Sequence, residues 1–493
     1  MIRELLKDLG RYLPSYILPA LVSILALPII TRLFPPADYG NYVLVLGTVS
    51  ILSAITTAWL GASIVRFFPA YKLDNRLREF HGTIIKLALI SIVVVSLIFS
   101  AVLFFARSHI SANLYSLMRI GLPVFIASSG LAIFLDFLRA KRQASWYSFL
   151  TIWRSIAGLG LGMALVMTFK YGVDGLLWGS FLSTIVALPL AWKVAVGKLS
   201  LKEGQVCSPM TSEMAKYGFP IMIVNLATWI LSVSDRYLLG LFRGSQEVGI
   251  YSASYAISER SILMIVSLFQ LAAGPIVFKI WENQGKEITR QFLSRLARYY
   301  LIIGLPAAVG LSLLSRPVTN LLIAPAYYQG YTIIPIVVSG AFFIGIQHPF
   351  SWVLTCQKRT DVLMYGLLGS ALLNISLNFL LIPRYGYMAA AFTTSISYAC
   401  LLLLTVFFSR RFLVWSFPFK SLGKIACACT MMGVVVYPIG NNLTLSSLTR
   451  LVLAICVGVV VYFVTLFLLG GVQKEEVQEV RTFIRNLQRG IKR

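Results

Sequence analysis

Fourteen apolar runs, each of roughly 20 residues, constrain this chain more than any other feature of its sequence. A transmembrane helix needs about 20 mainly apolar residues to cross the hydrocarbon layer. The runs are continuously apolar and do not alternate, which favours helices over a membrane barrel. The sequence therefore predicts an all-α polytopic membrane protein with fourteen transmembrane helices. The predicted spans lie near residues 13–33, 41–61, 82–106, 117–138, 147–169, 173–195, 217–240, 249–278, 299–323, 331–355, 362–382, 386–408, 421–439 and 449–470.

Composition excludes a soluble protein and leaves no room for a large domain outside the membrane. Hydrophobic residues make up 58% of the chain and charged residues 12%, whereas soluble domains carry about 25% charged residues. No polar stretch between the apolar runs is long enough to fold by itself. The six cysteines show no metal-binding spacing and lie mostly in apolar runs. We therefore predict neither a metal nor a cofactor.

The formal charge of +25 would suit a nucleic acid, a membrane surface or an anionic ligand as partner. With the N-terminus inside, the predicted cytoplasmic segments hold 32 of the 43 Lys and Arg residues, the outer segments hold 8 and the spans hold 3. This bias follows the positive-inside rule, so we predict that both termini are cytoplasmic. The basic loops then face membrane lipids, and no nucleic acid partner is needed. The segments 282–298 and 474–493 are expected to be amphipathic helices on that surface.

The chain also contains an internal repeat of six spans. The first span opens with RYLP at 11–14 and the seventh with KYGFP at 216–220. Each of these spans ends in an arginine, and each following span begins with a Gly-x-Tyr motif, at Gly40 and at Gly249. An even number of spans gives both units the same orientation, as in transporters built from parallel repeats. The predicted domains are an N-terminal lobe at 1–195, a cytoplasmic linker at 196–216, a C-terminal lobe at 217–408, a helix pair at 409–470 and a basic cytoplasmic tail at 471–493.

Four strings spread along the chain resemble bacterial polysaccharide-export and O-antigen flippases of the Wzx type. They are TRLFPPADYGNY, LGASIVRFFPAY, SDRYLLGLFRGSQEVGIYSASYAIS and NISLNFLLIPRYGYMAAAFTTSIS. The superfamily of these flippases also contains the MATE multidrug antiporters and the lipid II flippase of peptidoglycan synthesis. MATE exporters more often have twelve spans, so the two additional C-terminal spans favour a lipid-linked sugar as substrate.

This resemblance implies two six-helix lobes around a central cavity that work by alternating access. It implies transport of an undecaprenyl-diphosphate-linked oligosaccharide from the cytoplasmic to the periplasmic leaflet of the bacterial cytoplasmic (inner) membrane. Surface polysaccharide biosynthesis, such as that of the O-antigen of lipopolysaccharide, is the implied process. The implied partners are the glycan lipid, membrane lipids and polysaccharide polymerase or assembly proteins, and a monomer is expected.

A lipid diphosphate must carry negative charge through a region of low dielectric, which requires a path lined by cations. Arg154 and Arg260 lie deepest within their spans, where a side chain does not easily reach the headgroups. Arg32 and Arg236 lie near the outer ends of their spans, where an arginine can also extend to the headgroups or hold a helix end. We predict that these arginines bind the substrate.

Other polar residues have both a functional and a structural interpretation. Asp235 and Glu259 could bind a coupling cation or neutralise an arginine. Asp136 could serve in the same way, or it could pair with Arg139 or Lys141 at the cytoplasmic edge. His348 is predicted to be a proton relay or a hydrogen-bonded core residue. Asn225, Asn374 and Asn378 are predicted to line the cavity for sugar hydroxyl groups or, as we favour, to bond between helices. Arg66 and Lys279 are predicted to lie at a cytoplasmic gate or at the headgroups.

Two other functions stay open. A MATE-like antiporter for drugs or metabolites would need acidic residues to bind cationic substrates, whereas the deep charges are mostly arginine. A membrane polymerase or ligase would need a large outer loop with catalytic groups, and the longest outer loops have only about ten residues. We therefore expect no enzymatic activity. The sequence has no P-loop, which predicts coupling to a proton or sodium gradient, or to polysaccharide synthesis, in place of ATP.

Overall fold

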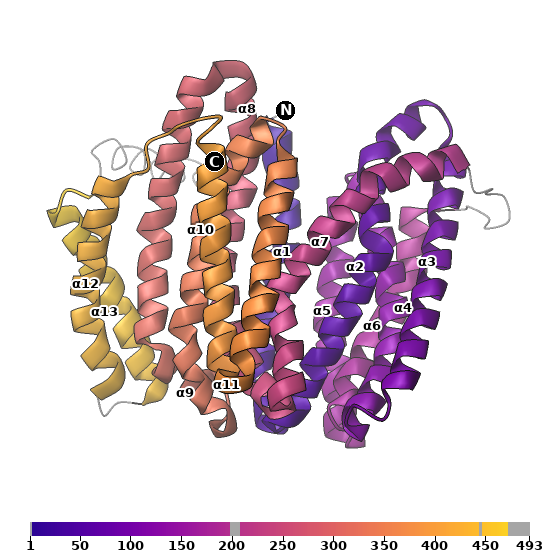
Figure 1. Ribbon diagram of the computed structural model, residues 1–493, viewed down its shortest axis with the longest axis horizontal. Coiled ribbons are helices and arrows are strands. Elements are labelled where there is room, and N and C mark those ends of the chain that lie inside the picture. The colour runs from indigo at the N-terminus through magenta and orange to yellow at the C-terminus, as the bar shows by residue number, and fades with distance from the viewer. Residues whose placement is uncertain (1, 198–207, 443–445, 472–493) are drawn as a thin grey trace, which may run out of the picture. The chain divides into compact units, whose positions relative to one another are not determined.

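A computed structural model describes residues 2–197, 208–442 and 446–471, and every regular element in these ranges is a helix (Figure 1). Twelve helical segments are long and apolar enough to cross a membrane. This confirms the predicted all-α polytopic membrane protein. The elements are α1 (Ile2–Leu33), α2 (Pro36–Leu73), α3 (Leu77–Ala106), α4 (Ala112–Ala140), α5 (Ala144–Phe169), α6 (Asp174–Ala195), α7 (Ser208–Arg243), α8 (Ser245–Leu313), α9 (Ser315–Leu322), the 3-10 helix η1 (Pro325–Ile333), α10 (Ile334–Cys356), α11 (Thr360–Ser409), α12 (Phe419–Asn442) and α13 (Ser447–Leu468).

The two longest helices, α8 and α11, are each broken once by a glycine. Gly285 has φ 79° and ψ −171°, and Gly386 has φ 57° and ψ −141°. A side chain disfavours a positive φ, so glycine is the residue that lets the chain turn back at these two points. Each of these helices contains residues of two predicted spans. The total of fourteen spans stays a prediction.

The segment 282–298 is not the separate surface helix that its sequence predicts. It contains the break at Gly285 and forms the tip of the α8 hairpin, near the α8 label in Figure 1. Leu293 and Ala297 are buried, whereas Lys286 is exposed. The amphipathic pattern therefore reflects a hairpin tip with one packed face and one solvated face. The other predicted surface helix, at 474–493, lies outside the described residues.

The chain divides into two compact units, and each unit has its own apolar core. In the first unit, Leu60, Phe80 and Phe137 are fully buried in one cluster. In the second unit, Val277 and Trp415 belong to another cluster. The predicted division into an N-terminal and a C-terminal lobe stays a prediction. The first unit comprises Met1–Arg260, Ile323–Gly330 and Met364–Ser397, and the second comprises Ser261–Leu322, Tyr331–Leu363 and Tyr398–Arg493.

The two Gly-x-Tyr motifs of the internal repeat meet inside the first unit. A Cβ atom added to Gly40, in α2, would lie 2.0 Å from the carbonyl oxygen of Ser245. A Cβ atom added to Gly249, in α8, would lie 1.9 Å from the carbonyl oxygen of Pro36. Each glycine thus faces the first residue of the other helix, and the two helix N-termini pack backbone against backbone. The sequence matches the motifs to each other but does not predict this contact.

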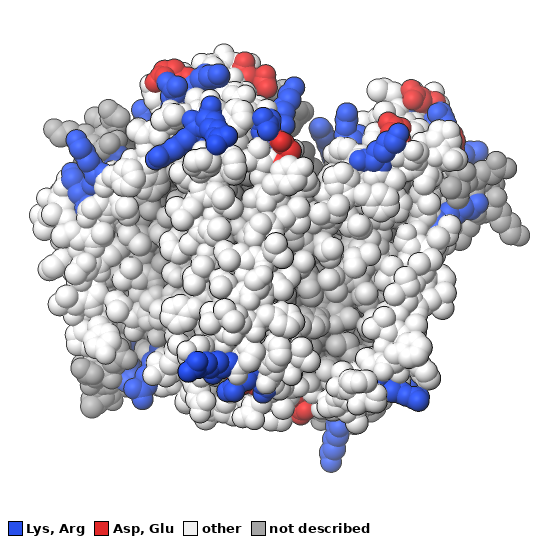
Figure 2. Space-filling model, viewed as in Figure 1, with Lys and Arg blue, Asp and Glu red and all other residues white. Residues whose placement is uncertain are grey.

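Charged side chains gather at the two ends of the helices, with an almost uncharged band between them (Figure 2). Large apolar side chains are exposed to the outside of the helices, among them Leu97 at 66% and Val460 at 61%. A protein in water normally buries most residues of this kind. The band therefore fits the hydrocarbon layer of a membrane.

Candidate functional site

Asp235 and Arg236, the adjacent charges of the seventh predicted span, form a buried ion pair in α7. Their side chains are 1% and 10% exposed. Arg236 Nη1 lies 3.3 Å from Asp235 Oδ1, and the backbone N–H of Arg236 donates to the same oxygen over 2.8 Å. The guanidinium also donates to the carbonyl oxygen of Ser232. Arg236 is thus paired with a carboxylate of the protein and does not extend to the headgroups.

Two tyrosines of α8 complete this buried cluster. The guanidinium carbon of Arg236 lies 4.5 Å from the centre of the Tyr255 ring and 5.6 Å from that of the Tyr251 ring, both cation–π distances. The Tyr251 hydroxyl donates to Asp235 Oδ2. The Tyr255 hydroxyl donates to Glu259 Oε1 over 3.3 Å. One arginine and two carboxylates are therefore joined through aromatic side chains.

The two tyrosines are absent from the predicted site, although their spacing is visible in the sequence. Tyr251, Tyr255 and Glu259 follow one another at intervals of four residues. This spacing places all three on one face of a helix. Tyrosine at such positions is also typical of core packing, so only the contact with Arg236 distinguishes a role in the site from simple packing.

Asn374 and Asn378 of α11 extend the cluster as a buried polar network. Asn378 Nδ2 donates to Asn374 Oδ1 over 3.0 Å, and Ser234 Oγ of α7 donates to the same oxygen over 3.3 Å. Thr394 Oγ1 donates to Asp235 Oδ2 over 3.4 Å and so connects α11 with the ion pair. The structure thus places Asn374 in the predicted bond between helices, with Asn378 as its neighbour in the network.

Arg154 and Arg260, the deep arginines, form no ion pair with any residue that the structure describes. Arg154 lies ten residues into α5, about 15 Å along the helix axis. It is half-buried and donates to Ser128 Oγ over 3.3 Å. Arg260 lies beside Glu259 in α8 and is exposed. A guanidinium without an ion-pair partner is costly in hydrocarbon, so these groups call for water or an anion.

Three further predicted cations, Arg32, Arg66 and Lys279, have exposed side chains. Arg32 lies in the last turn of α1, and the guanidinium carbon of Arg66 lies 6.0 Å from the centre of the neighbouring Phe67 ring. Their roles toward substrate or headgroups stay predictions.

The predicted bond between helices is wrong for Asn225, because its amide donates to a carbonyl oxygen of its own helix over 3.0 Å.

Asp136 pairs with Arg139, one of the two partners that the sequence predicts. Arg139 Nη1 lies 3.1 Å from Asp136 Oδ1. The carboxylate also lies against α2, where a Cβ atom on Gly61 would be 2.1 Å from Asp136 Oδ2. Burial lowers the pKa of Lys141, the other predicted partner, and the charge of Lys72 lowers it further. The ion pair with Arg139 and the contact with α2 give Asp136 a structural role.

His348 is hydrogen-bonded within the second unit. The amide nitrogen of Gln270, in α8, lies within hydrogen-bond distance of both ring nitrogens of His348, 2.9 Å from Nδ1. The Trp352 ring, one turn further along α10, has its centre 6.3 Å from that of the imidazole. Gln347 is buried beside it and donates to Thr405 Oγ1 over 3.1 Å. These bonds support the hydrogen-bonded interpretation of His348, and its described partners include no carboxylate.

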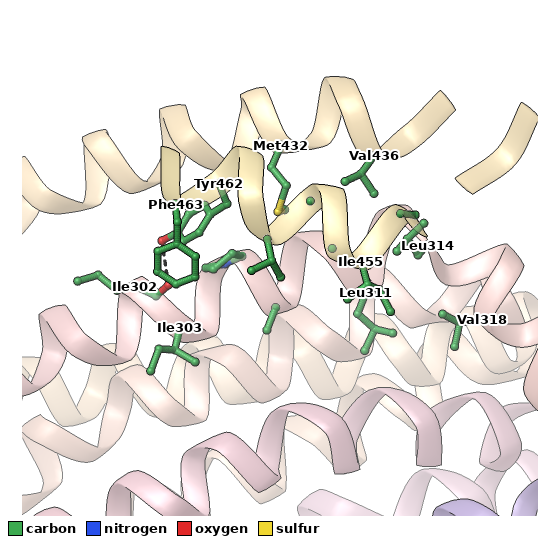
Figure 3. A pocket seen from close by; sticks show the side chains of 16 residues that line it. Ile302, Ile303, Leu311, Leu314, Val318, Met432, Val436, Ile455, Tyr462 and Phe463 are labelled. Atoms are coloured by element: carbon green, nitrogen blue, oxygen red, sulfur yellow. Dashed lines mark hydrogen bonds between the residues drawn. The ribbon is translucent and has the colours of Figure 1, made fainter. Parts of the chain in front are cut away.

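An apolar groove of about 360 Å³ lies in the second unit, between the second limb of α8 and the helices α12 and α13 (Figure 3). Leu311, Met432 and Ile455 point into it. Tyr462 is the one lining side chain with a polar atom, and its hydroxyl donates to the Ile302 carbonyl oxygen over 2.8 Å. The walls therefore suit a hydrocarbon chain and offer nothing to a sugar or a phosphate.

The site offers charges and hydrogen-bonding groups inside membrane-spanning helices. In the described ranges, no group of three or more His, Cys, Asp or Glu side chains could hold a metal ion. The buried cluster supplies one guanidinium, two carboxylates and several amide and hydroxyl groups. Such a set can bind and release ions or anionic groups as helices move, which is the chemistry of transport.

Fold and site together define a multi-span membrane transporter. A family model described as "Polysaccharide biosynthesis protein" matches residues 5–281, more than half of the chain, and the chain belongs to this family. A second model, MatE, matches residues 220–380. The protein is thus a flippase-type transporter of the superfamily that also holds the MATE proteins, which confirms the resemblance found in the sequence.

Two relatives and one solved structure are similar to this chain. The chain is 23% identical over 436 residues to the uncharacterized membrane protein MJ1068 of Methanocaldococcus jannaschii, covering 83% of this chain and 85% of that protein. It is 22% identical over 282 residues to the probable low-salt glycan biosynthesis flippase Agl15 of Haloferax volcanii, covering 56% and 58%. The inward closed structure of the lipid II flippase MurJ has a TM-score of 0.74 at 18% identity, covering 93% and 98%, and so shares the fold. Agl15 and MurJ are named as flippases and not as enzymes.

Proposed function

We propose that this protein moves an undecaprenyl-diphosphate-linked oligosaccharide from the cytoplasmic to the periplasmic leaflet of the bacterial cytoplasmic membrane by alternating access. The observation that carries the proposal is the state of Arg154 and Arg260. Both guanidinium groups lie within membrane-spanning helices, and neither forms an ion pair with a described residue. A diphosphate supplies the negative charge that such groups require, and it can accept several of their hydrogen bonds at once.

The apolar groove supports the lipid half of this substrate. Its lining comes from α8, α9, α12 and α13 and is apolar except for the Tyr462 hydroxyl, which bonds to the backbone. An isoprenoid chain buried there would gain the free energy of apolar contact without leaving a polar group unsatisfied. Within the second unit, the groove therefore matches the apolar part of a lipid diphosphate.

We also propose an orientation in the membrane, an oligomeric state and a biosynthetic process for this protein. The bias of Lys and Arg toward one set of loops supports cytoplasmic termini. We propose that the chain acts as a monomer in surface polysaccharide biosynthesis, between enzymes that build the lipid-linked unit and a polymerase or assembly protein that uses it.

We further infer that Asp235 and Glu259 couple transport to a proton or sodium gradient. Asp235 is paired with Arg236, and Glu259 is bonded to Tyr255, whose ring faces the same guanidinium. A substrate anion that draws Arg236 away would leave a carboxylate ready to take a cation, so the two binding events would assist each other. Export that continues unchanged after ionophores collapse both gradients would contradict this coupling.

A MATE-like antiporter for drugs or metabolites is the second candidate. The MatE match over residues 220–380 favours it, and a cationic drug that displaces Arg236 from Asp235 would be bound by the carboxylates of Asp235 and Glu259. Expression in a drug-sensitive strain tests it, because an antiporter raises resistance to cationic drugs whereas a flippase does not. For a membrane polymerase or ligase, the described residues offer no specific observation.

Substitution of the deep arginines tests the main proposal in a strain that lacks its own flippase. We expect Arg154→Ala and Arg260→Ala to abolish export of surface polysaccharide, because each removes a charge that the diphosphate needs. Arg154→Lys and Arg260→Lys should keep part of the activity, since the charge remains while the bidentate geometry is lost. The measurement is surface polysaccharide per cell at equal protein level.

Arg107→Ala is the matched control, because Arg107 is exposed at the C-cap of α3 and, among the described residues, its guanidinium contacts only the Phe104 ring. This variant should export normally. Full export by both deep alanine variants would refute the assignment of these cations. Failure of the unaltered protein to complement the strain with any glycan lipid would refute the flippase itself.

A further inference from the structure

Gln270 and His348 form a polar pair at a depth where hydrocarbon surrounds most of the helices. Gln270 lies nine residues before Lys279 in α8, about 14 Å along the helix. His348 lies eight residues before the end of α10 at Cys356, about 12 Å along that helix. Both side chains therefore sit well inside the apolar layer, where polar groups are rare and usually functional.

The pair is not sealed inside the packed core. Gln270 is exposed and His348 is half-buried. The Gln270 amide nitrogen contacts both nitrogens of the imidazole, Nδ1 over 2.9 Å. Among the residues that the structure describes, none forms a hydrogen bond with the amide carbonyl oxygen of Gln270. An amide left open to lipid would lose its hydration without compensation, so this exposed edge requires water or a polar ligand.

The surroundings of the pair are aromatic and uncharged. Trp352 is half-exposed, and its ring is tilted by 33° to the imidazole at 6.3 Å between centres. A small cavity beside the pair is lined by Tyr300, Phe269 and other residues without formal charge. A phosphate would find no cation here. On the exposed side of the pair, a sugar ring would find the Trp352 indole for its C–H face and the Gln270 carbonyl oxygen for a hydroxyl group.

We propose that Gln270, His348 and Trp352 form a subsite that binds a sugar ring of the transported glycan. The subsite rests on the proposed flippase function, to which it adds a source of substrate specificity. In this subsite, the Gln270–His348 pair binds neutral hydroxyl groups of the sugar. The pair carries no formal cation that would bind the diphosphate of the lipid.

Binding measurements on the purified full-length protein in nanodiscs test the subsite. The probes are undecaprenyl diphosphate alone and undecaprenyl diphosphate carrying one glucose, galactose or N-acetylglucosamine. We expect the unaltered protein to bind at least one sugar-bearing lipid roughly fivefold more tightly than the bare lipid, the gain typical of a neutral hydrogen bond. Gln270→Ala and His348→Ala should each remove this preference without changing the affinity for the bare lipid.

Gln347→Ala is the matched control, because Gln347 is the neighbour of His348 but is buried against Thr405. It should keep the preference for sugar even if it lowers stability. The subsite is refuted, with the flippase function intact, if the unaltered protein binds all four lipids equally or if both alanine variants retain the preference. Binding of none of the lipids would refute the proposed substrate and the subsite together.

Discussion

At the scale of single residues, the role of a charged side chain depends on the groups that it contacts in the folded structure. Arg32 and Arg236 occupy matching positions in the repeat, yet their surroundings differ. Arg236 is nearly buried between Asp235 and the two tyrosine rings, whereas Arg32 is exposed in the last turn of α1. An ion pair of this kind contributes little net stability when intact, but loss of one partner leaves a buried charge uncompensated.

Asp235→Asn should therefore destabilise the protein strongly. The substitution keeps the shape of the side chain but leaves Arg236 without its charged partner, at a cost of about 3–5 kcal/mol. We expect a clear fall in the unfolding temperature of the purified protein in detergent. The double variant Asp235→Asn with Arg236→Gln removes both charges and should recover most of that loss. A single variant as stable as the unaltered protein would show that Arg236 does not depend on Asp235.

At the scale of elements, glycines set how closely helices approach and where they turn. Gly40 and Gly249 let the N-termini of α2 and α8 touch, while Gly386 turns α11 beside Glu247. The Glu247 carboxylate accepts the backbone N–H of Tyr387 over 3.1 Å and pairs with Arg243 at 2.8 Å. These two bonds of Glu247 connect the turn between α7 and α8 to the break in α11.

Gly249→Ala tests the helix contact. Its new methyl group would meet the Pro36 carbonyl oxygen at 1.9 Å, and a backbone atom cannot rotate away as a side chain can. Overpacking of this kind costs about 1–3 kcal/mol, so the unfolding temperature should fall. Gly160→Ala, in α5, has nothing within 4 Å of the added carbon and should be neutral or up to about 1 kcal/mol stabilising. Equal behaviour of the two variants would contradict the close contact.

At the scale of the whole molecule, the distribution of charge predicts the orientation in the membrane. We expect a cysteine at Ser108 to lie outside and a cysteine at Gln284, at the tip of the α8 hairpin, to lie inside; both positions are exposed. In a variant with the six native cysteines replaced by serine, a membrane-impermeant maleimide should label Ser108→Cys in intact cells. Gln284→Cys should react only after permeabilisation. The reverse pattern would overturn the orientation predicted from the basic loops.

Much of the fold could be predicted because the bilayer imposes simple conditions. The hydrocarbon thickness sets the length of each apolar run, and unsatisfied backbone groups force those runs into helices. The positions of the deep arginines and the matching Gly-x-Tyr motifs are equally visible in the sequence. The sequence predicts a surface helix at 282–298, where the structure has a hairpin tip, because amphipathicity does not distinguish the two.

The sequence by itself thus determined the class of fold, the polar residues that need an explanation and the family resemblance. Only the tertiary structure decided that Asn374 bonds to a neighbouring helix while Asn225 bonds to its own, and that Tyr251 and Tyr255 enclose Arg236. The physical reason is that the side chains of a membrane-spanning helix meet an equally apolar environment whether they face lipid or a neighbouring helix. Hydrophobicity can therefore specify that a helix spans the membrane, but not how it is rotated or which side chains it presents to the next helix.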